Sequence, residues 1–276
     1  MTPRRHCSGV ALLPVLVLAC TTFDTTPVVD GGVSDASAAD VEVRVDGGGP
    51  TDAAVDATRE PFVCGSAWLC DDFEASAFPN PLWNWNADFV GPGGGVALLK
   101  EATAPSPSNV LFSKAAGGER GRLSARHTSG KALRCALDLK GLERGDSEAI
   151  LLQMGVQGAI AQYQVAFTVT TGDAVRVQAG GKGLDGGVFP DTAATVPLSS
   201  LGSWHHVDVE VGMGTAAQVR VAIDRSVVLS GPINGLDPLR ALGDSGQQFI
   251  YVGAAPSGTS ASVWKVAYDD VRCEDL

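Results

Sequence analysis

From Pro61 onward, apolar and polar residues alternate in short runs that are separated by Gly, Pro, Asp and Ser. Such alternation is typical of antiparallel strands with one buried face, and the separating residues favour turns. Helical periodicity is almost absent, so crossover helices between parallel strands are not expected. We therefore predict an all-β fold over residues 61–276, a two-sheet antiparallel sandwich. The expected strands are 68–74, 96–100, 109–114, 122–127, 132–140, 149–156, 161–170, 174–179, 205–211, 218–223, 226–230, 248–253 and 263–273.

The period of two also predicts which side chains enter the core. The inward positions of two neighbouring strands are Val207, Val209, Val211, Val219, Val221 and Ile223. Arg220 should face outward, where it can pair with Asp208 or Glu210. Among the aromatic residues, we expect Trp204, Phe167 and Phe249 in the core.

The first residues of the chain have the pattern of an export signal. Arg4 and Arg5 precede an apolar run that ends at Ala19 and is too short to span a bilayer. The end of this run, Val17-Leu-Ala-Cys20, resembles the lipobox of bacterial lipoproteins. The resemblance implies a signal peptide over residues 1–19, lipidation of Cys20 and attachment to the membrane through the lipid only. An ordinary secreted protein is the alternative.

Residues 20–60 should form a disordered acidic linker between the lipidated cysteine and the folded domain. They are rich in Asp, Gly, Ala, Thr, Val and Pro, and Phe23 is their only aromatic residue, so they cannot bury enough apolar surface to fold. Thr21 in place of an aspartate after Cys20 favours the outer membrane of a bacterial cell envelope. The net charge of −11 makes nucleic acid an unfavourable partner.

Four cysteines lie in the predicted domain: Cys64, Cys70, Cys135 and Cys273. In an exported domain four cysteines favour two disulfides, for which three pairings exist. We favour the pairs Cys64–Cys70 and Cys135–Cys273. Their spacing does not fit a zinc site, which needs closer pairs or nearby histidines.

Three segments together resemble the concanavalin A-like lectin and glucanase family, which includes laminin-G-like modules. The segments are Cys70-Asp-Asp-Phe-Glu74, Ser203-Trp-His-His-Val-Asp-Val-Glu210 and Tyr268-Asp-Asp-Val-Arg272. The resemblance implies a jelly roll in which the first and last strands pair and the concave sheet holds carbohydrate.

Glucanases of this family carry a strand with the motif Glu-x-Asp-x-x-Glu, which supplies the paired carboxylates of glycoside hydrolysis. The corresponding candidates, 149–154 and 162–167, carry glutamines instead. We therefore expect a non-catalytic envelope protein, not an enzyme, whose domain binds carbohydrate or a cell-surface protein. One alternative is a glycoside hydrolase or lyase that acts on polysaccharide at the concave sheet. A structural or adhesive module without a small ligand is another.

A polar stripe on the middle strands is the expected binding surface, because amide and guanidinium groups bond well to sugar hydroxyls. The residues chosen for ligand binding are Arg134, Gln153, Gln164, Arg176 and Trp85. The only cofactor that we expect is a structural calcium ion, which prefers carboxylate and carbonyl oxygens. The resemblance implies a site where the terminal strands meet, with the ligands Asp72, Glu74, Asp269 and Asp270.

Overall fold

The computed structural model divides the chain into two units, Met1–Ala57 and Thr58–Leu276. The structure describes residues 62–75, 78–90, 93–106, 109–128, 132–158, 161–171, 174–183, 192–197, 201–212, 217–233, 246–258 and 261–276. The predicted signal peptide, Cys20 and the acidic linker lie outside these residues. The described part contains no helix with the length and apolar character of a membrane span.

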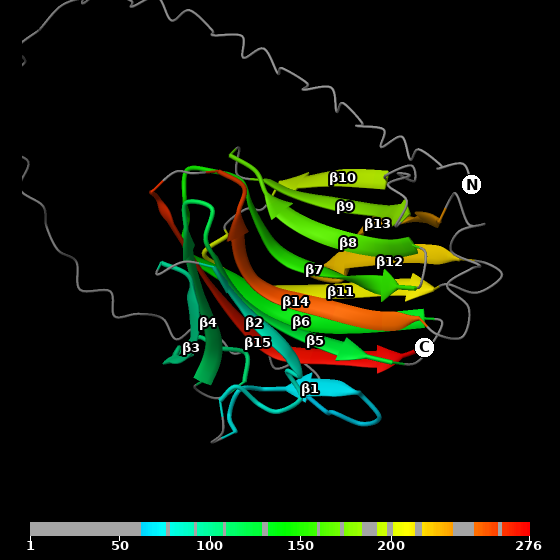
Figure 1. Ribbon diagram of the computed structural model, residues 1–276, viewed down its shortest axis with the longest axis horizontal. Helices are drawn as coiled ribbons and strands as arrows, with labels where there is room; N and C mark the ends of the chain where they lie inside the picture. Colours follow the sequence, from blue (N-terminus) through cyan, green and yellow to red (C-terminus); the bar gives the residue numbers. More distant parts are fainter. Residues whose placement is uncertain are drawn as a thin grey trace, which may run out of the picture. The chain divides into compact units, whose positions relative to one another are not determined.

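The described residues form two antiparallel sheets, as the alternation predicted. Figure 1 shows the strands of the two sheets stacked in layers. Sheet A has the order β13-β12-β11-β6-β15-β4-β3, and β1 pairs with β15. Its strands are β1 (Leu69–Asp71), β3 (Gly95–Lys100), β4 (Asn109–Ala116), β6 (Ala132–Glu143), β11 (His205–Gly212), β12 (Gln218–Ile223), β13 (Ser226–Pro232) and β15 (Val263–Asp275).

Sheet B has the order β10-β9-β8-β7-β14-β5-β2. Its strands are β2 (Trp85–Val90), β5 (Arg120–His127), β7 (Ala149–Gln157), β8 (Ala161–Val169), β9 (Ala174–Gly183), β10 (Thr192–Pro197) and β14 (Gln247–Pro256). Neighbours in both sheets are often far apart in sequence, as in the pairs β6–β15 and β7–β14. This exchange of strands between sheets is typical of a jelly roll.

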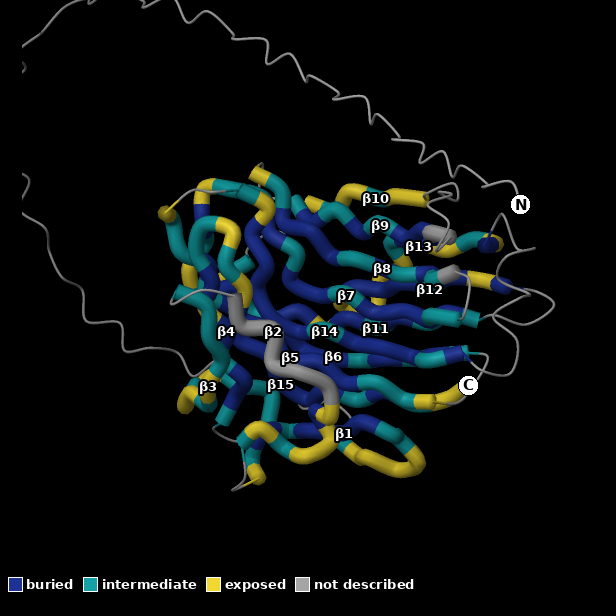
Figure 2. The backbone as a smooth tube through the Cα atoms, viewed as in Figure 1, coloured by how far each residue is buried: buried dark blue, intermediate teal, exposed yellow. Residues whose placement is uncertain are grey.

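The core lies between the two sheets and is built from the inward side chains of both. All six residues that the alternation placed inward in β11 and β12 are buried. Arg220 faces outward as expected, 4.0 Å from the carboxylate of Glu210. Figure 2 shows the burial concentrated in the central strands, with exposed residues on β10 and before β1.

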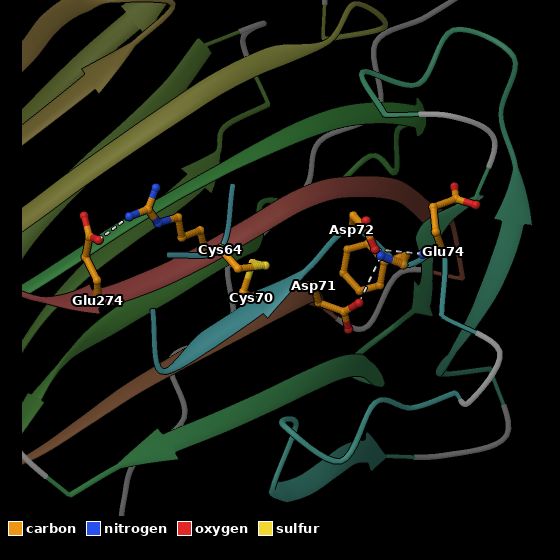
Figure 3. Close-up of a disulfide and its surroundings, with 8 residues drawn as sticks. Cys64, Cys70, Asp71, Asp72, Glu74 and Glu274 are labelled. Atoms are coloured by element: carbon orange, nitrogen blue, oxygen red, sulfur yellow. Dashed lines mark hydrogen bonds and ion pairs between the residues drawn. A yellow bond between two sulfur atoms is a disulfide. The ribbon is translucent and has the colours of Figure 1, made fainter. Parts of the chain in front are cut away.

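Two disulfides lie beside the terminal strands β1 and β15. Cys135 and Cys273 are cross-strand partners in β6 and β15 and are joined by a disulfide. Cys64 is joined to Cys70 of β1, and β1 pairs with the end of β15. Figure 3 shows the Cys64–Cys70 bond beside this pair of strands. The structure thus contains the cysteine pairing and the contact between first and last strands that the sequence analysis favoured.

Candidate functional site

The outer face of sheet B, which points away from the core, carries the chemistry that distinguishes this domain. Along β5, Leu123 and Ala125 are core residues, so Arg122, Ser124 and Arg126 point outward. The same parity turns the side chains of the other central strands outward at Gln247, Phe249, Tyr251, Gln153, Gln157, Gln162, Gln164, Arg176 and Gln178.

A pocket of about 240 Å³ opens on this outer face. Its lining residues come from four adjacent strands and are Arg122, Gln153, Gln157, Gln162, Phe249 and Tyr251. The volume lies just below the ~300 Å³ at which pockets for drug-sized ligands begin. The pocket is therefore suited to one ring-sized unit of a larger ligand, such as one sugar of a chain.

Two residues hold the ring of Tyr251 at the pocket wall. The guanidinium carbon of Arg122 lies 4.7 Å from the ring centroid, within the range of a cation–π contact. Phe249, two residues earlier on β14, meets the ring edge-on, with 5.8 Å between centroids. Arg122 is only 7% exposed, so its charge acts in a partly desolvated setting where electrostatic effects are stronger.

Three glutamines form a hydrogen-bonded group beside Tyr251. Gln164 Oε1 accepts a hydrogen bond from Gln153 Nε2 at 2.7 Å and another from Gln162 Nε2 at 3.2 Å. Because an amide has two N–H groups and one carbonyl, Gln153 and Gln162 each keep a carbonyl oxygen and one N–H for a ligand. The group can therefore offer both donors and acceptors to sugar hydroxyls or to a carboxylate.

Gly155 separates two of the lining glutamines on the outward side of β7. It lies on β7 between Gln153 and Gln157 and pairs with Phe249 of β14. A Cβ built at Gly155 would overlap the carbonyl oxygen of Tyr163 in β8. Glycine thus allows β7 and β8 to approach closely, and it adds no side chain between Gln153 and Gln157.

The outer face of sheet B differs in charge from the protein as a whole. The chain has a net charge of −11, yet all strands of sheet B except β2 lack aspartate and glutamate. Their outward arginines are Arg120, Arg122, Arg126 and Arg176. Carboxylates are instead numerous in sheet A, for example in β15 and β11. The four strands that line the pocket thus carry arginines and no carboxylates of their own, a balance that favours anionic ligands.

The structure brings together three of the five residues that we chose for ligand binding. Gln153, Gln164 and Arg176 share the outer face of sheet B. Arg134 does not, because β6 belongs to sheet A, where Arg134 pairs with Asp208 at 3.0 Å. This placement corrects the expectation of one continuous stripe. Trp85 lies on β2, and its side chain is outside the part that the structure describes.

The four acids chosen for calcium do not form a metal-binding group. Glu74 accepts hydrogen bonds from the backbone and side chain of Asn109, and Asp72 accepts one from the backbone of Glu74 (Figure 3). Asp269 accepts from the hydroxyl and backbone N–H of Ser106. Among the described residues no group of three or more His, Cys, Asp or Glu side chains could hold a metal ion. Calcium stays a prediction without a ligand cluster that supports it.

Asp269 is nevertheless unusual, because it is fully buried on the outward side of β15. Burial raises the pKa of its carboxyl to about 7, and the neighbouring Asp270 adds to the increase. Asp138 is its cross-strand partner on β6 and is hydrogen-bonded to His206. The Asp269 carboxyl thus lies in sheet A, whereas the pocket lies on sheet B.

The sequence analysis missed Arg122, Tyr251 and Phe249. The segment Arg120-Gly-Arg-Leu-Ser-Ala-Arg126 does place three arginines on one face opposite Leu123 and Ala125, and this signal could have been used. Phe249 is buried, as expected, but it lines the pocket on the outer face and is not part of the core. Nothing in the spacing along β14 indicated that Tyr251 would meet Arg122.

No protein-family model matches this sequence, and the curated protein sequences give no match either. Solved structures do match. A glucuronan lyase from the fungus Trichoderma reesei aligns with a TM-score of 0.50 and 12% identity, over 66% of this chain and 87% of its own. A family 7 alginate lyase, solved with its product, aligns with a TM-score of 0.50 and 10% identity, over 65% and 83%. A cellulose-induced protein aligns with a TM-score of 0.52 and 17% identity, over 75% and 97%.

These relatives overturn our expectation of a non-catalytic protein. Two of the three are enzymes that degrade polysaccharides, so this fold gives no ground for expecting a module that only binds. Identities of 10–17% establish the fold and leave the reaction to be argued from the site. The chain has the concanavalin A-like jelly-roll fold, in the form that polysaccharide lyases also use.

Proposed function

We propose that this protein is a polysaccharide lyase that cleaves an anionic, uronate-containing polysaccharide at the outer face of sheet B. The observation that carries the proposal is the pocket in which Arg122 lies over Tyr251 beside a group of glutamines. The four strands that line it contain no aspartate or glutamate, which favours a polyanionic substrate. Alginate and glucuronan, on which the similar enzymes act by their names, belong to this class of polymer.

The reaction of such a lyase is an elimination. A base removes the proton from the carbon next to the uronate carboxyl group, and the bond from the neighbouring ring carbon to the glycosidic oxygen breaks. The electron pair of the C–H bond becomes a carbon–carbon double bond, and the leaving oxygen receives a proton. No water is consumed, so atoms and charges balance within the sugar chain and the catalytic groups.

The pocket offers one group for each part of this reaction. Arg122 and the amide of Gln153 can bind the carboxylate and stabilise the negative charge that develops when the proton leaves. Among the residues that line the pocket, Tyr251 is the one whose side chain can both accept and donate a proton. We assign it the removal of the ring proton and the protonation of the leaving oxygen. In the first step Tyr251 acts as the phenolate, which becomes the neutral phenol when it takes the ring proton and returns to the phenolate when it protonates the leaving oxygen.

The sequence of the N-terminal segment supports a location where such substrates occur. We propose that residues 1–19 direct export and that lipidation of Cys20 attaches the enzyme to the bacterial cell envelope, with the outer membrane favoured. Residues 20–60 would then link the lipid to the catalytic domain. Metabolic labelling with a fatty-acid analogue tests this, and labelling of Cys20→Ala to the same extent would refute it.

The test of the enzyme is release of unsaturated uronate, followed by ultraviolet absorbance, from alginate, glucuronan and related polyuronates. We expect Tyr251→Phe to lower kcat by about 10²-fold to 10⁴-fold, the usual range for a general acid or base. The loss should leave thermal stability nearly unchanged. Arg220→Gln, an exposed change on sheet A, serves as the control. Full activity in Tyr251→Phe would refute the assignment, and absence of product from every polyuronate would refute the proposed function.

A further inference from the structure

Arg176 lies on the same outer face as the pocket, on β9 next to the lining strand β8, and is several strands away from Arg122. Arg122 is on β5, and β14, β7 and β8 separate it from β9, which carries Arg176. Four steps between neighbouring strands, at about 4.8 Å each, place the two arginines roughly 19 Å apart across the sheet. Several sugar units, and not one or two, are needed to span this distance.

The strand register places the two arginines toward the same end of sheet B. Arg122 pairs with Gly253 of β14, which lies within the irregularity between Val252 and Ala255. On the far side of that irregularity, Ile150, Thr168 and Arg176 are successive cross-strand partners on β7, β8 and β9. A polymer that crosses the strands from the pocket therefore runs toward Arg176.

The guanidinium of Arg176 is already arranged to hold one carboxylate. Its NH2 group lies 3.2 Å from a carboxylate oxygen of Glu148, and its Nε is buried without a hydrogen-bond partner among the described residues. The backbone carbonyl of Glu148 is fixed by the N–H and hydroxyl of Ser257. Both side chains of the ion pair are more than one-third exposed, so a competing carboxylate can reach Arg176 from solvent.

We propose that Arg176 forms a distal anion subsite, in which a carboxylate of the bound polymer replaces Glu148 as the partner of the guanidinium. The inference rests on the proposed function, because the pocket fixes where the polymer begins to cross the sheet. The subsite makes the enzyme selective for length: an oligouronate that fills the pocket alone gains nothing from Arg176, whereas a longer chain binds at both places.

The two members of the ion pair should respond in opposite directions when they are changed. Arg176→Gln removes the cation, so it should raise Kd and KM for long oligouronates by about threefold to tenfold. Glu148→Gln removes the competing carboxylate, so it should lower both constants for the same ligands. Neither change should alter Kd or KM for a disaccharide or a trisaccharide. An exposed ion pair adds little to stability, so both variants should fold.

The experiment uses the whole chain and size-defined oligouronates prepared from alginate and from glucuronan, from disaccharide to octasaccharide. Binding is measured by calorimetry with Tyr251→Phe as the background, and turnover is measured with the native tyrosine. Arg220→Gln is the matched control, because Arg220 pairs with Glu210 on sheet A and its side chain has the same 39% exposure as that of Arg176.

The outcomes separate this proposal from the proposed function. Length-dependent binding that weakens in Arg176→Gln, without any product, supports the subsite and refutes the lyase. If product forms and Arg176→Gln weakens binding equally at every length, or not at all, the subsite is refuted and the lyase remains supported. If Arg220→Gln weakens oligouronate binding as much as Arg176→Gln does, the cause is general attraction by charge, and the subsite is also refuted. If no oligouronate binds to any variant, both proposals fail.

Discussion

The pKa of Asp269 predicts that this protein becomes less stable as the pH rises from about 4 to about 7. An unfolded aspartate releases its proton near pH 3.8, whereas burial keeps the folded carboxyl protonated up to about pH 7. Between these values the folded state binds the additional proton, so the unfolding free energy falls with increasing pH. The difference between the two pKa values, at about 1.4 kcal/mol for each pKa unit, corresponds to about 4 kcal/mol.

The variant Asp269→Asn isolates this contribution. Asparagine resembles the protonated carboxyl and can still accept a hydrogen bond from Ser106, so its stability near pH 4 should be close to that of the native protein. At pH 8 the variant should be more stable by an amount on the order of 4 kcal/mol. Urea unfolding at several pH values, with the disulfides intact, gives the difference directly. A difference that stays constant from pH 4 to pH 8 would refute the reasoning.

Calcium should be varied in the same experiment. A cation bound to Asp269 would stabilise its ionised form and lower the pKa of the carboxyl. In calcium at pH 8, the native protein and Asp269→Asn should then have nearly the same stability. An identical pH profile in calcium and in chelator would argue against the calcium site that the sequence suggested at Asp269.

Two further predictions concern the pocket and the disulfides. Gly155→Ala should force β7 and β8 apart, lowering stability by about 1–3 kcal/mol and abolishing turnover; thermal melts and product assays check this. Gly231→Ala, where a Cβ has open space, is the control, and equal effects of both changes would contradict the explanation. Replacing Cys135 and Cys273 by alanine should cost about 5 kcal/mol, against about 2 kcal/mol for Cys64 and Cys70, because the two disulfides close chain segments that differ greatly in length. Urea denaturation of the two double variants tests which loses more unfolding free energy. Equal losses would show that the entropy of loop closure does not determine the difference.

The alternation of residues was sufficient to predict the two sheets, because the burial of one strand face imposes a period of two. The inward valines of β11 follow this rule, and so does the outward Arg220. The alternation does not show which of the two sheets a strand belongs to. Arg134 and Gln153 both lie on outer faces, but β6 pairs with β11 and β15 in sheet A, whereas β7 pairs with β8 and β14 in sheet B.

The pocket could be predicted only in part for the same reason. Gln153 and Gln164 are near each other in sequence and on adjacent strands, so the polar pattern pointed to them. Arg122 and Tyr251 are 129 positions apart and meet because β5 pairs with β14, a long-range pairing that no local pattern encodes. Phe249 shows a further limit, since an aromatic residue can be buried by neighbours on the outer face as well as by the core.

The pairing of β1 with β15 determines how the domain carries mechanical load. A pull on the chain before Phe62 reaches the domain first at the Cys64–Cys70 loop and then at β1, which bonds laterally to the end of β15. The Cys135–Cys273 disulfide passes the load from β15 to β6, in the centre of sheet A. Strand pairing and the Cys135–Cys273 disulfide thus direct tension from the N-terminal side into sheet A, whereas none of the strands of sheet B that form the pocket carries a disulfide.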